Sequence, residues 1–481
     1  MSYEIVVVGG GIGGLTTAAL LAKRGLSVCL LERQPFVGGC VAPFEKFGYS
    51  FHNSFGLHAF WNDGEIHQRI LMELNLPTPE LRKISHPYTV LLDDEKVTVA
   101  SDAETLATTL RNVFPECKEA VLAFYERAAE VGELWLSSTT EGSDLSGSSR
   151  SFFSRRRGRN ELSRLANDTV EQHSDRLSSR CLRFLDAQLC VFAQANVSEC
   201  SYLYACVLVA LLKRGLIDFA GGADSLGRSL TTAIKNFGGV VRFNSPVLRL
   251  AYDEHGKATA VQLLNGETVT ATRAVISNLT LWDTYGKLVG ADRTPAAVRQ
   301  KLKEISSPGV YEVMLGVDAT EADSLPTNLI IQTSSSAPSL TLSVAPSWAS
   351  RAPEGKRAAV IQAAVDVHDW FTYHTDESEA EEQDRQMLES VWAKLSDSMP
   401  SLFSSAELIE TATPRDTYEN TRRKLGMMGG LPQTPANFQS GSLNLETHLP
   451  NLYCVGDTVG LGFGIAGVTH TAWAVANKLT K

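Results

Sequence analysis

The sequence predicts an α/β fold in which one domain is assembled from both ends of the chain and a mixed α+β domain is inserted between them. Three observations predict this arrangement. Residues 5–14 run from a short apolar strand directly into a glycine-rich turn, and residues 15–24 continue with helical periodicity. Residues 452–479 repeat this order of strand, glycine turn and helix. Between the two ends, helical periodicity gives way to short alternating strands.

The composition is that of an ordinary folded protein, with 43% hydrophobic and 20% charged residues in a chain of 481. The net charge of −10 argues against a nucleic-acid partner, and eight cysteines without a CxxC pair argue against a disulfide scaffold. The longest apolar stretch, residues 201–212, is shorter than the roughly 20 residues that cross a bilayer, and the N-terminus lacks a signal-peptide pattern. We expect a cytoplasmic protein, and attachment to a membrane surface stays open.

The N-terminal turn has the spacing of a dinucleotide-binding motif. Glycines between a strand and a helix permit a tight turn, the approach of backbone to a pyrophosphate, and close packing of the helix on the strand. Glu32 follows at the end of a second strand, residues 27–31, where its carboxylate can accept both ribose hydroxyls of an adenosine. We predict a Rossmann-like site that contains Gly9, Gly11, Gly13, Gly14 and Glu32.

Glycines elsewhere favour FAD over NAD. Gly38 and Gly39 follow Glu32 closely, at a place where an NAD fold needs no glycine. At the end of the strand 452–455, Gly456 admits a phosphate and Asp457 can hold hydroxyls of the ribityl chain, unless that aspartate merely caps a helix.

The last helix completes the predicted FAD site. Residues 462–467 imitate a second dinucleotide motif, but only 14 residues follow, too few for the returning strand and its acid. We interpret the start of this helix, including Gly467 and Val468, as facing the flavin pyrimidine, where amide groups stabilise the negative charge of reduced flavin.

The middle of the chain contributes further strands. A helix is predicted over 221–235 behind a Gly-Gly pair. Short strands follow over 240–243, 247–252, 258–264 and 267–271, with Asn265-Gly266 as a hairpin turn and a buried strand at 275–276. Residues 279–409 show mixed periodicity and predict no order of elements.

Several motifs also carry a family resemblance. Residues 8–14, with Leu31-Glu32-Arg33 and Val37-Gly38-Gly39, resemble the amine-oxidase-type flavoproteins of the glutathione-reductase fold. Five other stretches resemble, more narrowly, the FAD-dependent family of phytoene desaturases, carotenoid 3,4-desaturases and carotenoid isomerases; they are residues 48–51, 184–189, 221–226, 276–278 and 452–457. The resemblance implies that Arg33 belongs to the FAD site, that the backbone of Val247 holds the adenine ring, and that Gly456 and Asp457 form the terminal flavin motif.

Two departures from the family leave the substrate and the direction of the reaction open. The residue after Gly38-Gly39 is often arginine in desaturases, whereas Cys40 stands here, as in proteins that resemble retinol saturase. The Phe-Asp-x-Gly motif of the family is replaced by Phe51-His52-Asn53-Ser54, with the glycine delayed to Gly56.

The resemblance implies a hydrophobic polyene as substrate and, as first choice, a desaturase that moves hydride from an allylic carbon to flavin N5. Asp186 and His58 are candidates for the acid or base, although Asp186 can instead cap or pair and His58 can be structural. Without a second nucleotide fold, electrons are expected to leave to a quinone or to oxygen. The histidines show no metal-ligand spacing, so no catalytic metal is expected.

Alternative functions stay open. A carotenoid cis–trans isomerase or a retinol-saturase-like reductase would use the same scaffold, and an amine oxidase for small substrates or a non-catalytic escort of prenylated proteins are more distant choices. The basic stretch 150–164 contains six arginines around Phe152-Phe153, which suits an anionic membrane surface or a solvated loop. The apolar helix 201–212 is expected in the core rather than in lipid.

We divide the chain into five segments on these grounds. The FAD-binding domain takes residues 1–84, 216–285 and 411–481. A helical segment that faces the substrate, or a membrane, takes residues 85–215, and a substrate domain takes residues 286–410.

Overall fold

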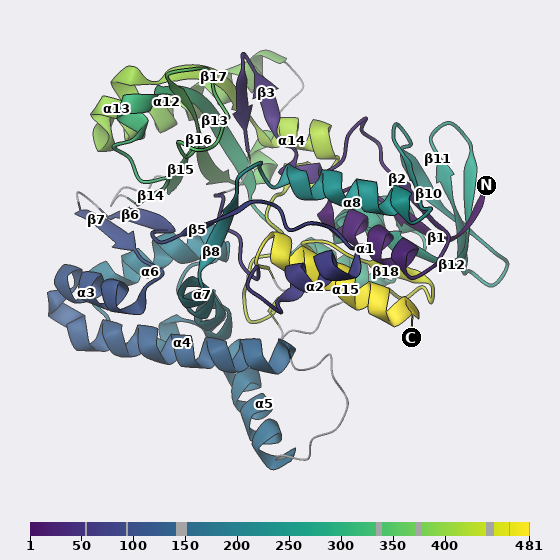
Figure 1. Ribbon diagram of the computed structural model, residues 1–481, viewed down its shortest axis with the longest axis horizontal. Coiled ribbons are helices and arrows are strands. Elements are labelled where there is room, and N and C mark those ends of the chain that lie inside the picture. The colour runs from purple at the N-terminus through teal and green to yellow at the C-terminus, as the bar shows by residue number, and fades with distance from the viewer. Residues whose placement is uncertain are drawn as a thin grey trace.

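The structure, a computed structural model, describes residues 1–52, 55–92, 95–140, 152–332, 339–371, 377–438, 447–460 and 462–480, without the side chains of 139–140, 152–159 and 377–378. Two seven-stranded sheets and a group of helices make up the described chain (Figure 1). Both termini lie at the same end of the molecule, beside the first sheet.

The first sheet brings the two ends of the chain together. β1 (Ser2–Val8) lies between β2 (Val28–Leu31) and β12 (Thr268–Ser277), and all three are parallel. The other edge of β12 takes two neighbours: antiparallel β11 (Ala258–Leu263) along its first half and parallel β18 (Leu452–Cys454) along its second. The sheet is completed by β9 (Val240–Arg242) and β10 (Val247–Tyr252). The predicted assembly of an α/β domain from both ends is confirmed. The two strands predicted over 267–271 and 275–276 are one strand, because β1 pairs along nearly its whole length.

Both faces of this sheet are buried, which explains the unbroken apolar run of β1. Ile5 and Val7 point into a core that they share with helices, whereas Val6 and Val8 point into a second core on the opposite face. Three helices pack together on the first of these faces: α1 (Ile12–Lys23), α8 (Asp224–Asn236) and α15 (Ile465–Thr480).

The second sheet has one face covered and one face open to a cavity. Its order is β17-β13-β16-β15-β14-β6-β7. On β13, Tyr311, Val313 and Leu315 face a core that includes α12 and α13, while Glu312 and Met314 point the other way. The bounds are β6 (Tyr88–Leu92), β7 (Glu95–Val99), β13 (Gly309–Asp318), β14 (Asn328–Gln332), β15 (Leu340–Val344), β16 (Lys356–Val365), β17 (Glu407–Ala412), α12 (Glu377–Ser398) and α13 (Pro400–Ser405).

The segment predicted as helical from residue 85 differs at its start. β6 and β7 open it as strands, because β6 pairs in parallel with β14, more than two hundred residues later. The helices then follow as α3 (Ala103–Val113), α4 (Lys118–Thr140), α5 (Phe152–Asn167), α6 (Ser179–Phe192) and α7 (Tyr202–Arg214). α7 packs along α4 and buries most of its side chains, as expected of a core helix. Among the described residues, no helix combines the length and the apolar character of a bilayer-spanning segment.

Shorter elements connect these layers. The hairpin β3 (Phe44–Lys46) and β4 (Tyr49–Phe51) packs against the second sheet, and β5 (Leu81–Ile84) pairs with β8 (Leu216–Phe219). The others are α2 (Ile66–Glu73), α9 (Leu281–Asp283), a π-helical turn (Thr284–Gly290), α10 (Ala296–Glu304), α11 (Ala319–Ala322) and α14 (Pro414–Thr421).

Candidate functional site

A cavity of about 1170 Å³ extends through the centre of the protein, with walls from both sheets and from α4, α6, α7 and α15. One arm follows the glycine-rich segments from the two ends of the chain. The other arm runs between the helices. The volume exceeds the roughly 300–1,000 Å³ of a pocket for one small ligand, so both a cofactor and a substrate have room.

The glycine turn after β1 is shaped by Asn278 at the end of β12. Asn278 donates its backbone N–H to the Val8 carbonyl at 2.9 Å, which places its side chain under the turn. A side-chain carbon at Gly11 would lie 2.6 Å from Asn278 Nδ2, and one at Gly13 would lie 2.6 Å from its Oδ1. A side chain at either position would displace the Asn278 amide, which explains the two glycines. Gly14 does not line the cavity; a side-chain carbon there would meet the Gly9 carbonyl, so its role is close packing.

Glu32 lies at the end of β2 and lines the cavity, where it is tied to the turn. Its Oε2 accepts from the Gly10 N–H at 2.6 Å and its Oε1 from the Gln34 N–H at 2.8 Å. Val247, at the start of β10, lines the same arm. Arg33 also lines it and donates to the carbonyls of Glu419 and Asn420 on α14.

Gly38 and Gly39 lie directly beside the glycine turn. The Gly38 N–H donates to the Gly10 carbonyl at 2.9 Å, and a side-chain carbon at Gly39 would approach Gly11 Cα to 3.4 Å. The glycine turn after β1 and the Gly38-Gly39 pair, which are separate in the sequence, thus form one surface. Cys40 follows on the cavity wall, and burial raises the pKa of its thiol.

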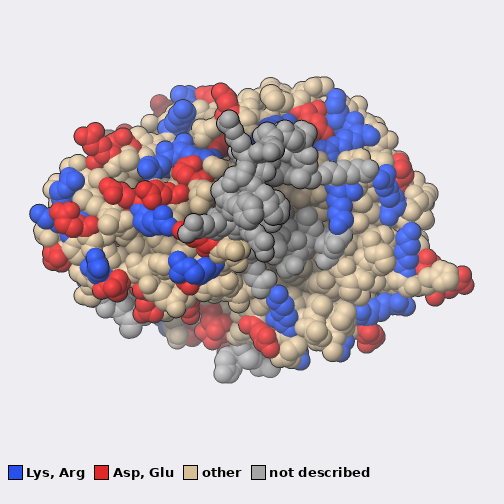
Figure 2. Space-filling view, turned by 90° about the horizontal axis from the view of Figure 1, so that it is seen from below, with Lys and Arg blue, Asp and Glu red and all other residues tan. Residues whose placement is uncertain are grey.

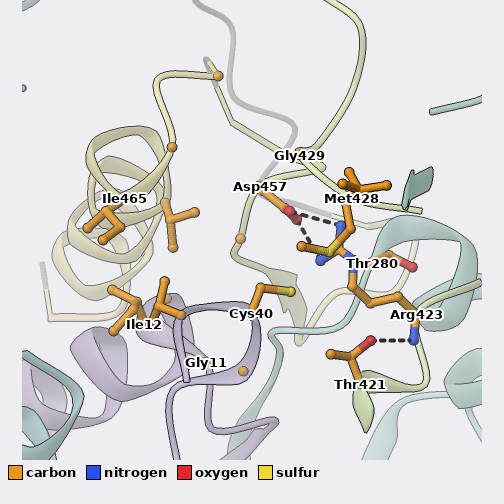
Figure 3. Close-up of a pocket in the computed structure, with 18 of the residues that line it drawn as sticks. Gly11, Ile12, Cys40, Thr280, Thr421, Arg423, Met428, Gly429, Asp457 and Ile465 are labelled. Carbon is orange, nitrogen blue, oxygen red and sulfur yellow. Dashed lines mark hydrogen bonds and ion pairs between the residues drawn. The ribbon is translucent and has the colours of Figure 1, made fainter. Parts of the chain in front are cut away.

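The carboxyl-terminal motif holds an ion pair that the sequence did not predict. Gly456 has a positive φ of 126° and donates its N–H to Thr471 Oγ1 at 3.0 Å. Asp457 accepts from Arg423, with its Oδ2 2.9 Å from Nη2 (Figure 3). Burial alone would lower the pKa of Arg423, but the adjacent Asp457 carboxylate more than offsets this and raises it. Arg423 also donates from Nε to the Met427 carbonyl at 2.6 Å, so the turn 423–427 that presents the guanidinium to Asp457 is held together.

Two helices begin at the cavity wall. Ile12 and Ile465, at the starts of α1 and α15, lie close to one another in Figure 3. Val468 lines the cavity. Gly467 does not, because its α-carbon packs against the Gly462 carbonyl, which a side chain would clash with. Free N–H groups at two converging helix starts, a carboxylate at Glu32 and another at Asp457 fit an extended dinucleotide such as FAD.

His58 and Asp186, the two predicted acid–base candidates, lie in different surroundings. His58 lines the cavity, and its ring lies 4.7 Å from that of Phe219, centroid to centroid. Burial lowers the pKa of His58 to about 4, so the imidazole is neutral at neutral pH. Asp186 does not line the cavity; its Oδ1 accepts from the Val197 N–H at 2.7 Å. That hydrogen bond fixes the loop after α6. It corresponds to the alternative in which Asp186 caps backbone instead of serving as acid or base.

A buried carboxyl that the sequence analysis missed faces the cavity from the second sheet. Glu312, in the middle of β13, is 4% exposed and accepts from Gln362 Nε2 at 2.6 Å. Burial raises the pKa of Glu312 to about 7. The available signal was an acid inside an apolar strand, in the part of the chain where no element was predicted.

Two predicted features lie partly outside the described residues. Asn53 and Ser54 are among those left out, while burial lowers the pKa of His52 to about 4. In the basic stretch 150–164, residues 150–151 and the side chains of 152–159 are not described, and Arg164 pairs with Asp168 at 3.2 Å. Figure 2 shows Lys and Arg side chains interspersed with Asp and Glu over the face seen from below.

Comparison with known proteins places this geometry among flavoproteins. A family model described as "Flavin containing amine oxidoreductase" matches residues 12–480. The chain is 27% identical to a prolycopene isomerase of Daucus carota over 99% of its own length and 80% of that protein. It is 24% identical to an all-trans-retinol 13,14-reductase of Danio rerio over 66% of this chain and 55% of the reductase. The family model confirms the predicted superfamily, and the relatives confirm the predicted resemblance to carotenoid isomerases.

Solved structures agree on the fold. An oxidoreductase from Methanosarcina mazei has a TM-score of 0.67 and 17% identity, covering 99% of this chain and 100% of that one. Cyclohexylamine oxidase from Brevibacterium oxydans has a TM-score of 0.62 and 15% identity, covering 100% of both chains. At such identities the likeness shows the fold alone.

Proposed function

The chain belongs to the family of flavin containing amine oxidoreductases and is an FAD-dependent oxidoreductase; we propose that it acts on a long hydrophobic polyene and isomerises its double bonds between cis and trans. One observation carries the proposal: the cavity continues from the FAD-binding segments into an apolar arm between α6 and α7. The sequence alone favoured desaturation. The similarity to a prolycopene isomerase over 99% of this chain supports isomerisation instead.

The residues along the first arm match the successive parts of FAD. Glu32 and Val247 would hold the adenosine, the free amides at the start of α1 the pyrophosphate, and Asp457 the ribityl chain. The start of α15 would face the pyrimidine. Bound flavin supplies a ring that can carry negative charge beside the substrate or exchange hydride with it.

The second arm fits an extended apolar chain. Its wall is built from aliphatic and aromatic side chains of three helices, which exclude water and orient a rod-shaped substrate by contact alone. These side chains are Phe124, Leu185, Leu189, Phe192, Ala205, Leu208, Val209, Leu211 and Leu212.

Glu312 supplies the acid and base that isomerisation needs. Near neutral pH, with a pKa of about 7, its carboxyl can both give and take a proton. A proton from Glu312 added to one carbon of a cis double bond leaves a cation delocalised over the polyene, and the former double bond can then rotate. Return of the same proton to Glu312 restores the double bond, so the mass of the substrate is unchanged. Neutral His58 also lines the cavity.

The test is incubation of the purified FAD-loaded protein, oxidised or reduced, with a poly-cis carotene in liposomes. Unchanged mass with shifted absorbance is the expected result, and Glu312→Gln should abolish it while FAD stays bound. Loss of two hydrogens would mean desaturation, with electrons passing to a quinone or to oxygen. Gain of two hydrogens would mean saturation, as in the retinol reductases.

Delivery of such a substrate requires a lipid surface, and we retain the stretch 150–164 as the proposed membrane contact. The measurement is flotation with anionic vesicles. Replacement of its arginines by glutamine should release the protein from the vesicles, and unchanged flotation would refute this contact.

A further inference from the structure

Three polar side chains interrupt the apolar arm of the cavity. Tyr88 on β6, Tyr125 on α4 and Gln188 on α6 all line the arm and are 3%, 7% and 7% exposed. Their neighbours along the wall, Phe124 and Leu189 among them, are apolar. β6 and α6 pack together on the side of the molecule away from the first sheet (Figure 1). Polar groups at such a place need hydrogen-bond partners.

The hydrogen bonds within this cluster use most of its groups. Tyr88 donates its hydroxyl proton to Gln188 Oε1 at 2.8 Å. Gln188 Nε2 donates to the Phe184 carbonyl at 2.8 Å, and the Gln188 side chain also hydrogen-bonds with the Tyr125 hydroxyl. Burial raises the pKa of both tyrosines, so both hydroxyls keep their protons. Because Gln188 Oε1 already accepts from Tyr88, we assign the second Nε2 proton to the Tyr125 oxygen. The Tyr125 proton then has no acceptor among the described residues, and the Tyr88 oxygen keeps a lone pair.

Tyr204 shows that a tyrosine in this cavity can be satisfied by the protein. Its hydroxyl donates to the Phe192 carbonyl at 3.0 Å and accepts from the Phe463 N–H at 3.4 Å. Tyr125 differs because it lines the arm and, with this assignment, its proton has no protein acceptor among the described residues. An unused donor is costly in a dry, apolar space, whereas a ligand oxygen would satisfy it.

We propose that Tyr88, Tyr125 and Gln188 form a subsite for a hydroxyl group at one end of the polyene. A hydroxyl matches both remaining groups, because its oxygen can accept from Tyr125 and its proton can be donated to the Tyr88 oxygen. This inference rests on the proposed function and adds to it a preference, among polyenes, for those that carry a terminal hydroxyl. A site that hydrogen-bonds a hydroxyl binds the analogue without it less tightly, because the buried donor is then left unpaired.

The test compares two polyenes that differ by one terminal hydroxyl, all-trans-retinol and 15-deoxyretinol. Their dissociation constants are measured by titration of the oxidised, FAD-loaded protein without turnover. The alcohol should bind roughly ten- to hundredfold more tightly. Tyr125→Phe should remove most of this preference by weakening the alcohol alone. Tyr202→Phe is the matched control, because it deletes a hydroxyl from a 3% exposed tyrosine on α7 that does not line the cavity.

Each outcome has a distinct meaning. Equal affinity of the wild-type protein for the two compounds would refute the subsite while leaving the polyene function in place, and this comparison needs no variant to fold. A preference that survives in Tyr125→Phe would also refute it. Failure of both compounds to bind, with FAD present, would overturn the proposed function itself.

Discussion

Replacing Glu312 by glutamine should stabilise the protein at high pH and leave it almost unchanged at low pH. Below about pH 4.5 the carboxyl is protonated in both the folded and the unfolded chain. Between 4.5 and about 7 the folded chain alone keeps the proton, so wild-type stability falls as pH rises, and above 7 the loss is complete. The gap between 4.5 and about 7 corresponds to about 3 kcal/mol of unfolding free energy.

The assay is urea unfolding of wild type and Glu312→Gln in excess FAD, at about pH 5 and about pH 8. Glutamine has the same shape and can still accept from Gln362 Nε2, so the difference reports the charge. We expect Glu312→Gln to raise the free energy of unfolding by less than about 1 kcal/mol at the lower pH and by about 3 kcal/mol at the higher pH. Glu407→Gln, on the exposed edge strand β17, is the control and should shift neither. A gain equal at both pH values would refute the burial argument.

Three further predictions test the two arms separately. Glu32→Ala removes the acceptor of the Gly10 and Gln34 N–H groups and should weaken FAD binding by about 1–3 kcal/mol, measured by flavin fluorescence; unchanged occupancy would contradict its assigned role. Ala205→Trp should fill the apolar arm and weaken polyene binding at least roughly tenfold while the flavin spectrum is kept; retained polyene affinity would place the substrate elsewhere. Arg423→Leu leaves Asp457 unpaired and should cost about 1.5–3 kcal/mol in urea unfolding, which an unaltered midpoint would refute.

The FAD-binding arm was predictable because short contiguous motifs build it. Gly11, Glu32 and Gly456 each follow a strand whose apolar run marks its end, and parallel strands bring those ends to one edge of the sheet. Asn278, whose side chain packs against Gly11 and Gly13, was visible only as part of a family motif. Its role depends on a contact between β1 and β12, which no local pattern contains.

The second sheet was not predictable for the same reason. β6 and β7 lie next to β14 only because segments more than two hundred residues apart pair, and local periodicity around them is mainly helical. Glu312 and Asp186 illustrate the consequence. Both are acids among apolar residues, but whether each faces the cavity or a backbone amide is decided by tertiary packing. An acidic residue within an apolar run can therefore be singled out from the sequence, but its role cannot.

The different origins of the two arms bear on how one scaffold supports different reactions. FAD would contact turns whose glycines pack closely against Asn278 and against neighbouring segments, so this arm tolerates little change. The apolar arm is lined by side chains on helices, where substitutions alter length and polarity without moving the backbone. Glu312 and Tyr88 lie on strands of the second sheet, and the partners of Tyr88 lie on α4 and α6. We therefore expect proteins of this fold to share the cofactor, and to differ in substrate class and reaction through changes in the residues of the second sheet and of α4 and α6.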